Sequence, residues 1–170
     1  VVDPATGAGV SRGEAGELLV RGPQVMKGYL NAPEATAAML DPDGWLHTGD
    51  LGTVDEHGYV FIVDRVKELI KYKGLQVAPA ELEAVLISHP EVADAAVVRY
   101  PDEQAGEVPK AFVVARNPVD PEELMAFVAE RVAPHKKVRR VEFVDEIPKA
   151  ASGKILRRLL MDRDREGAAG

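Results

Sequence analysis

Near its carboxyl end the sequence carries a lysine in an unusual setting. In "PKAASGKILRR", residues 148–158, Lys154 follows a Ser-Gly pair and precedes an apolar pattern typical of a helix, formed by Ile155, Leu156, Leu159 and Leu160. A helix start carries partial positive charge and favours anions over cations, and the chain has a formal net charge of -7. A solvated surface lysine is one interpretation. The other is that Lys154 and the helix end both face an anionic ligand.

A second candidate for chemistry is Asp50 in "GWLHTGDLG", residues 44–52. A carboxylate in such a turn can accept two hydrogen bonds from a vicinal diol such as a ribose. The competing interpretation is a turn aspartate that bonds its own backbone. His47 lies nearby, but the four histidines are scattered without the spacing of metal ligands, so we expect no metal site.

The "SGK" segment also invites comparison with a phosphate-binding loop. A Walker-type loop needs a glycine five positions before the glycine of the Gly-Lys pair, and Ser or Thr after the lysine. This chain has Pro148 and Ile155 at those positions. A Walker-type loop is therefore excluded.

The composition limits the possible classes of protein. With 170 residues, 46% of them hydrophobic and 29% charged, the chain can form one domain or two small ones. Its acidic balance argues against a general nucleic-acid binder, and no apolar run approaches the roughly 20 residues of a membrane helix. Cysteine is absent, which excludes disulfides and thiolate metal sites and is compatible with the cytoplasm.

The elements that must position these residues fall into two parts, with a candidate boundary near 64–67. The first part is β-rich, with an expected strand in 16–22, a helix in 32–40, and a hairpin of strands 51–55 and 59–63. The second part is mixed, with a hairpin in 67–77 turning at Lys73-Gly74, helices in 79–89 and 120–132, strands in 93–100, 110–115 and 138–144, and a last helix after Lys154. Asp120, Pro121 and Glu123 form a helix-start signature. We therefore predict an α+β fold.

Four segments, in this order and spacing, strongly resemble the adenylate-forming acyl- and aryl-CoA ligases, and 4-coumarate–CoA ligases most closely. They are "GELLVRGPQVMKGYLNAPEAT", "GWLHTGD", "DRVKELIKYKGLQVAPAELE" and "PKAASGK". The resemblance covers nearly the whole chain but only the carboxy-terminal third of such an enzyme. It implies that residues 1–63 end the large AMP-binding domain, that 64–67 form a hinge, and that 68–170 form a small α+β lid domain. The missing N-terminal part of the enzyme would hold the ATP loop, so we expect the 170-residue chain alone to be inactive.

The resemblance also implies a reaction and a role for each matching residue. A carboxylate attacks the α-phosphate of ATP to give an acyl-AMP and pyrophosphate, and the thiol of CoA then displaces AMP. Mg2+ would bind upstream of this chain. The implied roles are Lys154 as the lysine of adenylation, Asp50 and Arg65 at the ribose hydroxyls, Lys67 at the hinge, Lys71 at the adenylate in the thioester-forming state, Lys73 and Gly74 along the CoA channel, and Gln76 near AMP. For Lys67 and Lys73 a surface lysine remains an open alternative.

Other readings of the same resemblance stay open. Adenylation modules that load a carrier protein usually have Gly-x-Arg-Ile-Glu-x-x-Glu-Ile-Glu where this chain has "GLQVAPAELE", residues 74–83, which favours a CoA ligase. Luciferase-like oxidation uses a similar lid, and a noncatalytic binding or regulatory module of this fold is a further alternative. The pattern from Pro148 to Lys154 also resembles the site at which protein acetyltransferases modify acyl-CoA synthetases, although the same pattern serves as the catalytic loop itself.

Overall fold

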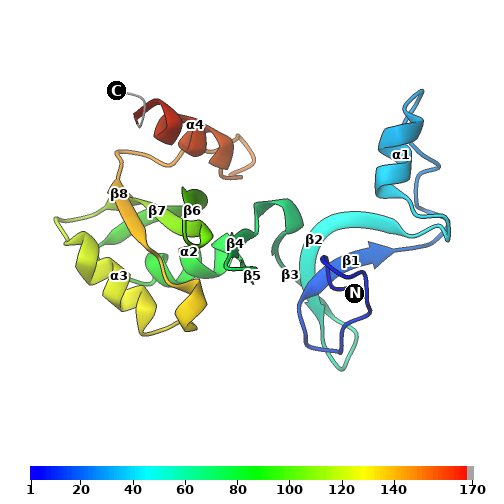
Figure 1. Ribbon diagram of the computed structural model, residues 1–170, viewed down its shortest axis with the longest axis horizontal. Coiled ribbons are helices and arrows are strands. Elements are labelled where there is room, and N and C mark those ends of the chain that lie inside the picture. The colour runs from blue at the N-terminus through cyan, green and yellow to red at the C-terminus, as the bar shows by residue number, and fades with distance from the viewer. Residues whose placement is uncertain (168–170) are drawn as a thin grey trace. The chain divides into compact units, whose positions relative to one another are not determined.

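The computed structural model describes residues 1–167, and their side chains up to Asp164. The last three residues of the predicted 68–170 lid lie outside this range. The chain divides into two compact units, Val1–Lys67 and Glu68–Gly170, called unit 1 and unit 2 below. Figure 1 shows the elements of each unit.

Unit 1 is a three-stranded antiparallel sheet in the order β1-β2-β3, accompanied by one short helix. Its elements are β1 (Gly16–Val20), α1 (Pro33–Met39), β2 (Leu46–Val54) and β3 (Val60–Arg65). The predicted strand, helix and hairpin are all present. β3 runs two residues farther than expected because Arg65 is the cross-strand partner of Asp50.

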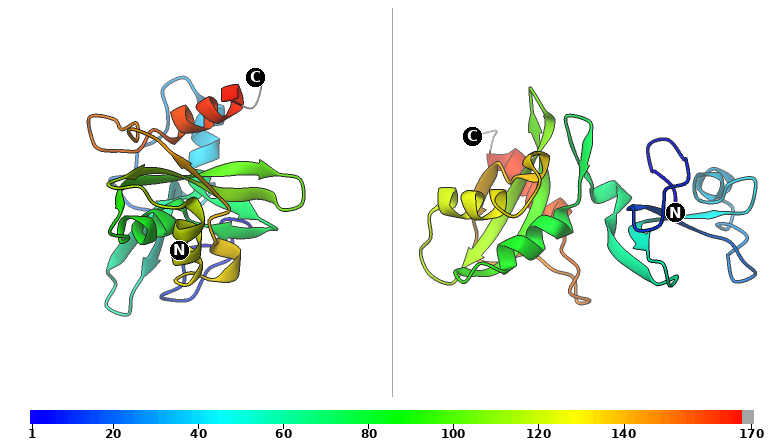
Figure 2. Two further views of the ribbon diagram at one scale, coloured as in Figure 1. Left: turned by 90° about the vertical axis from the view of Figure 1, so that its left-hand side faces the viewer. Right: turned by 90° about the horizontal axis from the view of Figure 1, so that it is seen from below.

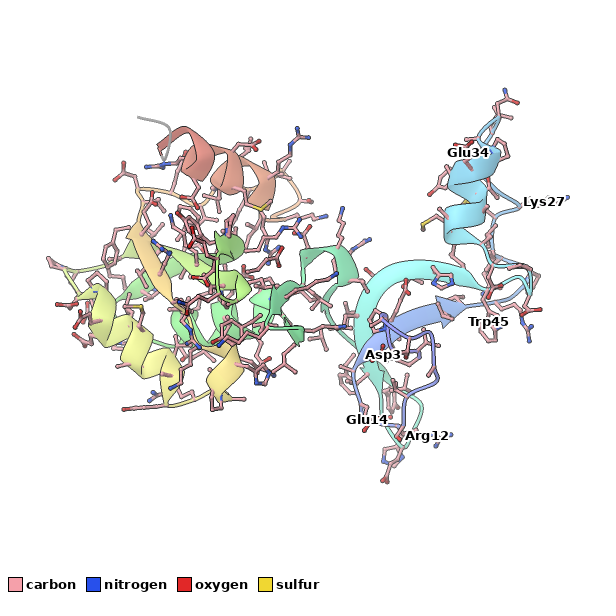
Figure 3. The ribbon with its side chains drawn as sticks, in the orientation of Figure 1. Asp3, Arg12, Glu14, Lys27, Glu34 and Trp45 are labelled. Carbon is pink, nitrogen blue, oxygen red and sulfur yellow. The ribbon has the colours of Figure 1, made fainter. Side chains whose placement is uncertain are left out.

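Two arginines secure loops of unit 1. Arg12 donates a hydrogen bond of 3.3 Å to the carbonyl of Glu56 in the turn between β2 and β3. The guanidinium of Arg21 lies 4.5 Å from the ring centroid of Trp45, just before β2, in cation–π contact. Arg12 and Trp45 lie at opposite ends of the sheet (Figure 3), so both ends of β2 are held in place.

Unit 2 is built on a five-stranded sheet with strand order β5-β4-β7-β6, in which β8 pairs with β7 in parallel. The strands are β4 (Ile70–Tyr72), β5 (Leu75–Val77), β6 (Val92–Asp102), β7 (Gly106–Ala115) and β8 (Arg140–Phe143). A single-turn 3-10 helix, η2 (Pro134–Lys136), precedes β8, and a second one, η1 (Val66–Glu68), spans the boundary between the two units.

Helices cover both faces of this sheet (Figure 2). α2 (Pro79–Ile87) and α3 (Pro121–Ala129) pack on one face, and α4 (Arg157–Gly167) packs on the other. Each face of the sheet has its own hydrophobic core, and alternate residues of β6 pack into one or the other. Ala95 and Val97 face α2 and α3, while Ala96 and Val98 face α4. Burial on both faces explains why the centre of this strand, residues 95–98, is a continuous apolar run. In the described part of the chain, no helix combines the length and apolarity needed to cross a bilayer.

The local signals of unit 2 mostly predicted its structure correctly. Lys73 and Gly74 both have positive φ, 49° and 80°, as a two-residue hairpin turn requires. Asp120 caps α3 by accepting a hydrogen bond of 2.8 Å from the backbone N–H of Glu122. Glu123 does not complete a capping box, because its carboxylate lies 3.8 Å from the ring of His89.

The expectation for the start of the last helix was wrong. α4 begins at Arg157, so Lys154 precedes the helix by three residues. Leu156 and Leu159, which matched the apolar pattern, are 36% and 54% exposed, while Leu160 is buried. The reason is that the backbone N–H of Leu156 donates to the carbonyl of Pro148, 2.8 Å away, which closes a loop instead of extending the helix.

Candidate functional site

In unit 1, Asp50 and Arg65 form a pair across β2 and β3. Oδ1 of Asp50 lies 2.7 Å from Nε of Arg65, and the side chains are 30% and 47% exposed. This contact uses one carboxylate oxygen and one guanidinium nitrogen. The other carboxylate oxygen and the terminal guanidinium nitrogens can therefore act as acceptor and donors for a ligand with neighbouring hydroxyls.

Asp50 lies within β2 and pairs with Arg65 across the sheet, so the expectation that it occupies a turn before the hairpin was wrong. Side chains from two strands hold the backbone around it. One oxygen of Glu17 accepts the N–H of Gly49 at 3.1 Å, and the other lies 3.0 Å from Nδ1 of His47. The hydroxyl of Thr48 accepts the N–H of Asp50 at 3.1 Å. His47 is thus engaged by a carboxylate, and the described residues contain no group of three or more His, Asp or Glu that could hold a metal ion.

In unit 2, the β4–β5 hairpin presents four of the predicted residues. Lys71 and Gln76 are cross-strand partners, and Lys73 and Gly74 form the turn. The backbone N–H of Lys71 donates to Glu107 at 2.8 Å, and that of Lys73 donates to the carbonyl of Ala105 at 2.9 Å. The backbone is therefore anchored to the β6–β7 hairpin while the Lys71 and Lys73 side chains remain exposed.

Lys154 lies in a closed loop of unit 2. A β-bridge joins Lys149 to Ile155 at its base, and the carbonyl of Lys154 accepts the N–H of Ala150 at 2.8 Å. Gly153 has a φ of 81°, a conformation that glycine adopts without strain. The Lys154 side chain is exposed, and no carboxylate in the described part of the chain lies within ion-pair distance of it. The loop thus fixes the backbone and leaves the ammonium available.

A buried ion pair, which the sequence did not reveal, anchors the end of this loop. Arg157 donates two hydrogen bonds of 2.8 Å to the carboxylate of Glu83 in α2, and a third of 3.2 Å to the carbonyl of Val97 in β6. The two side chains are only 13% and 9% exposed. Both hydrogen bonds to the carboxylate start at Nη2, while Nε donates to Val97, so the guanidinium is held at two nitrogens and its orientation is fixed. It ties the residue three positions after Lys154 to the core of unit 2.

A second ion cluster lies on the α4 side of the sheet and serves the packing of unit 2. Lys110 contacts Asp164 of α4 and lies 2.7 Å from Glu142 of β8, with its own side chain 10% exposed. Burial works against the ammonium, but the hydrogen bonds that Lys110 donates to Asp164 and Glu142 outweigh it, so the pKa of Lys110 rises above its ordinary value. The cluster joins α4 to β7 and β8.

The predicted site residues therefore lie in two different units of the chain. Asp50, Arg65 and the exposed Lys67 of η1 belong to unit 1, and the hairpin residues and Lys154 belong to unit 2. The structure brings Asp50 to Arg65 and Lys71 to Gln76. The sequence did not reveal the contact of Glu107 with Lys71, 36 positions away, or the pairing of Arg157 with Glu83, 74 positions away. No local pattern links residues at such separations.

Comparison with known proteins identifies the class to which this architecture belongs. Residues 81–154 match the AMP-binding enzyme C-terminal domain. The structure of ATP-bound MatB from Rhodopseudomonas palustris superposes with a TM-score of 0.89 at 36% identity, covering 96% of this chain and 33% of that one. The chain therefore belongs to the adenylate-forming enzyme family.

Within that family the chain is similar to 4-coumarate–CoA ligases. It is 56% identical to the 4-coumarate–CoA ligase of Pinus taeda over 163 residues, and 61% identical to 4-coumarate–CoA ligase-like 6 of Oryza sativa subsp. japonica over 164 residues. These matches cover 96% and 95% of this chain. The chain spans 30% and 27% of the length of these two relatives.

Proposed function

We propose that the chain is the C-terminal portion of an ATP-dependent acid–thiol ligase that converts a carboxylic acid to its acyl-AMP and then to its CoA thioester. The observation that carries the proposal is the identity of 56% and 61% to CoA ligases over nearly the whole chain. It is supported by two anchored segments of unit 2 that each present an exposed lysine, Lys71 and Lys154.

Lys154 serves the first half-reaction. A carboxylate and the triphosphate of ATP repel each other, so a cation that contacts both orients them and stabilises the charge that develops at the α-phosphate. The closed loop holds the backbone of Lys154 in position, and the exposed ammonium is free to meet the anions. The ligand that Lys154 faces is therefore the substrate.

Asp50 and Arg65 hold the nucleotide in both half-reactions. Their 2.7 Å contact pre-orients the carboxylate, whose remaining oxygen accepts hydrogen bonds from the ribose hydroxyls. Mg2+ bound with ATP would neutralise charge at the phosphates, and the proposal places its ligands outside this chain. A reaction that consumes ATP and CoA is expected in the cytoplasm.

The β4–β5 hairpin serves the second half-reaction. Lys71 and Gln76 contact the acyl-adenylate, and Lys73 and Gly74 line the path of CoA. Because Lys71 and Lys154 come from separate segments of unit 2, a rotation of the lid at residues 64–67 exchanges one for the other. Lys67 is the residue whose backbone torsion changes in that rotation.

Lys154 is also the proposed target of a protein acetyltransferase. Its side chain and those of its neighbours Ala151 and Ser152 are exposed, so a modifying enzyme has access when ATP is absent. Acetylation removes the ammonium charge and keeps the side-chain stem. The expected result is loss of adenylation with the thioester step retained.

The test uses the full-length enzyme. Carboxylate-dependent exchange of pyrophosphate into ATP reports acyl-AMP formation, and release of AMP with thioester formation on adding CoA reports the second step. Pyrophosphate exchange without thioester formation would favour the alternative of a module that loads a carrier protein. If neither activity is found with a panel of aliphatic and aromatic acids, a noncatalytic module would be favoured. The 170-residue chain alone should show neither activity.

A further inference from the structure

The loop that carries Lys154 is closed by hydrogen bonds between its own residues, such as the one from the N–H of Ala150 to the carbonyl of Lys154. These bonds fix the shape of the loop, but they do not join it to the sheet of unit 2. Ile155 packs against the core on the α4 side of the sheet, and apolar contacts of this kind are non-directional. The orientation of the loop therefore depends on its polar contacts with the sheet.

An ion pair joins the first leg of this loop to β6. Nζ of Lys149 donates a hydrogen bond of 2.6 Å to Oδ2 of Asp94. Oδ1 of Asp94 accepts the N–H of Ala95 at 3.0 Å, so the strand itself orients the carboxylate. Lys149 also forms the β-bridge to Ile155, the residue after Lys154. The ion pair therefore restrains the backbone next to Lys154.

The buried Arg157–Glu83 pair joins the second leg of the loop to the same strand. Oε1 of Glu83 accepts the N–H of Val97 at 2.8 Å, and Nε of Arg157 donates to the carbonyl of Val97 at 3.2 Å. In an antiparallel strand the N–H and C=O of one residue point to the same side. Since β6 ends the strand order with β7 as its neighbour, the pair lies along the outer edge of β6.

Both ion pairs thus lie on one edge of β6, between residues 94 and 97. Residues 95–98 are at most 2% exposed, and a segment buried to this extent opens only with much of the fold. A group attached to a rigid strand is held more precisely than one on a loop alone. The ammonium of Lys149 is directed at the strand, while that of Lys154 is exposed.

We propose that the two ion pairs on the edge of β6 aim Lys154 at ATP and the carboxylic acid in the adenylation step, and that their four side chains are positioning residues. The inference rests on the proposed function, which assigns that step to Lys154. Displacing a reacting group by about 1 Å costs roughly 10²-fold in rate, so loss of one of two anchors should slow adenylation about tenfold. The hairpin that carries Lys71 is held by Glu107 instead, so thioester formation should keep its rate.

The Lys149–Asp94 pair gives the cleaner test, because its side chains are 38% and 29% exposed and its removal costs little stability. In the full-length enzyme, Asp94→Ala and Lys149→Met should each slow carboxylate-dependent pyrophosphate exchange about tenfold and leave thioester formation from supplied acyl-AMP unchanged. The exchanged pair, Lys149→Asp with Asp94→Lys, should recover most of the lost rate. The control Arg158→Gln removes an exposed cation just after the loop and should change neither half-reaction.

The buried pair is tested by Arg157→Lys, which keeps the charge beside Glu83 without the planar fork of arginine and should slow the same half-reaction. Two results would overturn the proposal. A loss of adenylation in Lys149→Met but not in Asp94→Ala would mean that Lys149 itself contacts the substrate. Equal slowing of both half-reactions would mean that the pairs act on the fold of unit 2 as a whole.

NMR relaxation of the 170-residue chain tests the anchoring without relying on ligase activity. The order parameters of the amides of residues 150–154 should fall in Asp94→Ala and remain at the wild-type values in Arg158→Gln. Unchanged order parameters in Asp94→Ala contradict the positioning role. A wild-type enzyme that forms no acyl-AMP contradicts the proposed function, and the relaxation measurement still decides whether the pair holds the loop.

Discussion

Replacement of Arg157 by methionine should destabilise unit 2 strongly, because it removes the cation from a buried pair. The Glu83 carboxylate, 9% exposed, would lose two hydrogen bonds of 2.8 Å. Breaking a buried ion pair from one side costs roughly 3–5 kcal/mol. The N–H of Val97 still donates to Glu83 at 2.8 Å, so we expect a loss near the lower end, about 3 kcal/mol.

The adjacent arginine supplies the control. Arg158 is 89% exposed and lies 3.6 Å from Asp162 one turn later, so Arg158→Ala should cost less than about 0.5 kcal/mol. Removing both partners of the buried pair, in the double variant Arg157→Met with Glu83→Leu, should recover part of the lost stability, because no charge is then left buried.

Equilibrium urea unfolding of the 170-residue chain, followed by the NMR amide signals of α2 and β6, measures these differences in the free energy of unfolding. Hydrogen exchange at Ala150 and Gly153 should also accelerate in Arg157→Met, since their N–H groups close the Lys154 loop. If Arg157→Met and Arg158→Ala cost the same within 0.5 kcal/mol, the pair does not anchor the loop and the reasoning fails.

Three further perturbations address other parts of the chain. The pKa of Lys110 is raised above 10.5 in the folded state, so its ion pairs should stabilise the fold fully below that pH and lose this contribution as the pH rises further. The difference in the free energy of unfolding between wild type and Lys110→Met, measured by urea unfolding, should be constant from about pH 7 to 10 and shrink at higher pH. A difference that grows at higher pH contradicts the assignment. Lys67→Pro fixes φ near -65°, so in the full-length enzyme the thioester step should fail while adenylation persists, and two intact rates would move the hinge elsewhere. Acetylation of Lys154, verified by mass spectrometry, should abolish acyl-AMP formation and spare thioester formation from supplied acyl-AMP; unchanged adenylation would refute both the modification and the catalytic role.

Local chemistry in the sequence was sufficient to predict several features of the fold. The turn at Lys73-Gly74 follows from the need for positive φ at two successive residues. The start of α3 follows from the capping oxygen of Asp120 and the fixed φ of Pro121. In both cases the residues that determine the structure are neighbours in the sequence.

Features that depend on distant partners were not predictable. Ile155 and Leu156 matched the period of a helix, but a β-bridge to Lys149 and a hydrogen bond to Pro148 hold them in a loop. Likewise, from the sequence alone a charged residue such as Arg157 is expected at the surface. Only the fold shows that it pairs with Glu83 of α2. For the candidate site, the resemblance supplied residues whose roles stay predictions, and the structure adds the cross-strand contact between Asp50 and Arg65.

The most direct test of the account measures both half-reactions of the full-length enzyme in two variants, Lys154→Ala and Lys71→Ala. Removing one pre-organised electrostatic group costs roughly 10²–10³ in rate. Lys154→Ala should lose that factor in carboxylate-dependent pyrophosphate exchange and keep thioester formation from supplied acyl-AMP, while Lys71→Ala should show the reverse. If either variant slows both half-reactions by the same factor, the proposal that the lid presents a different lysine in each half-reaction is wrong.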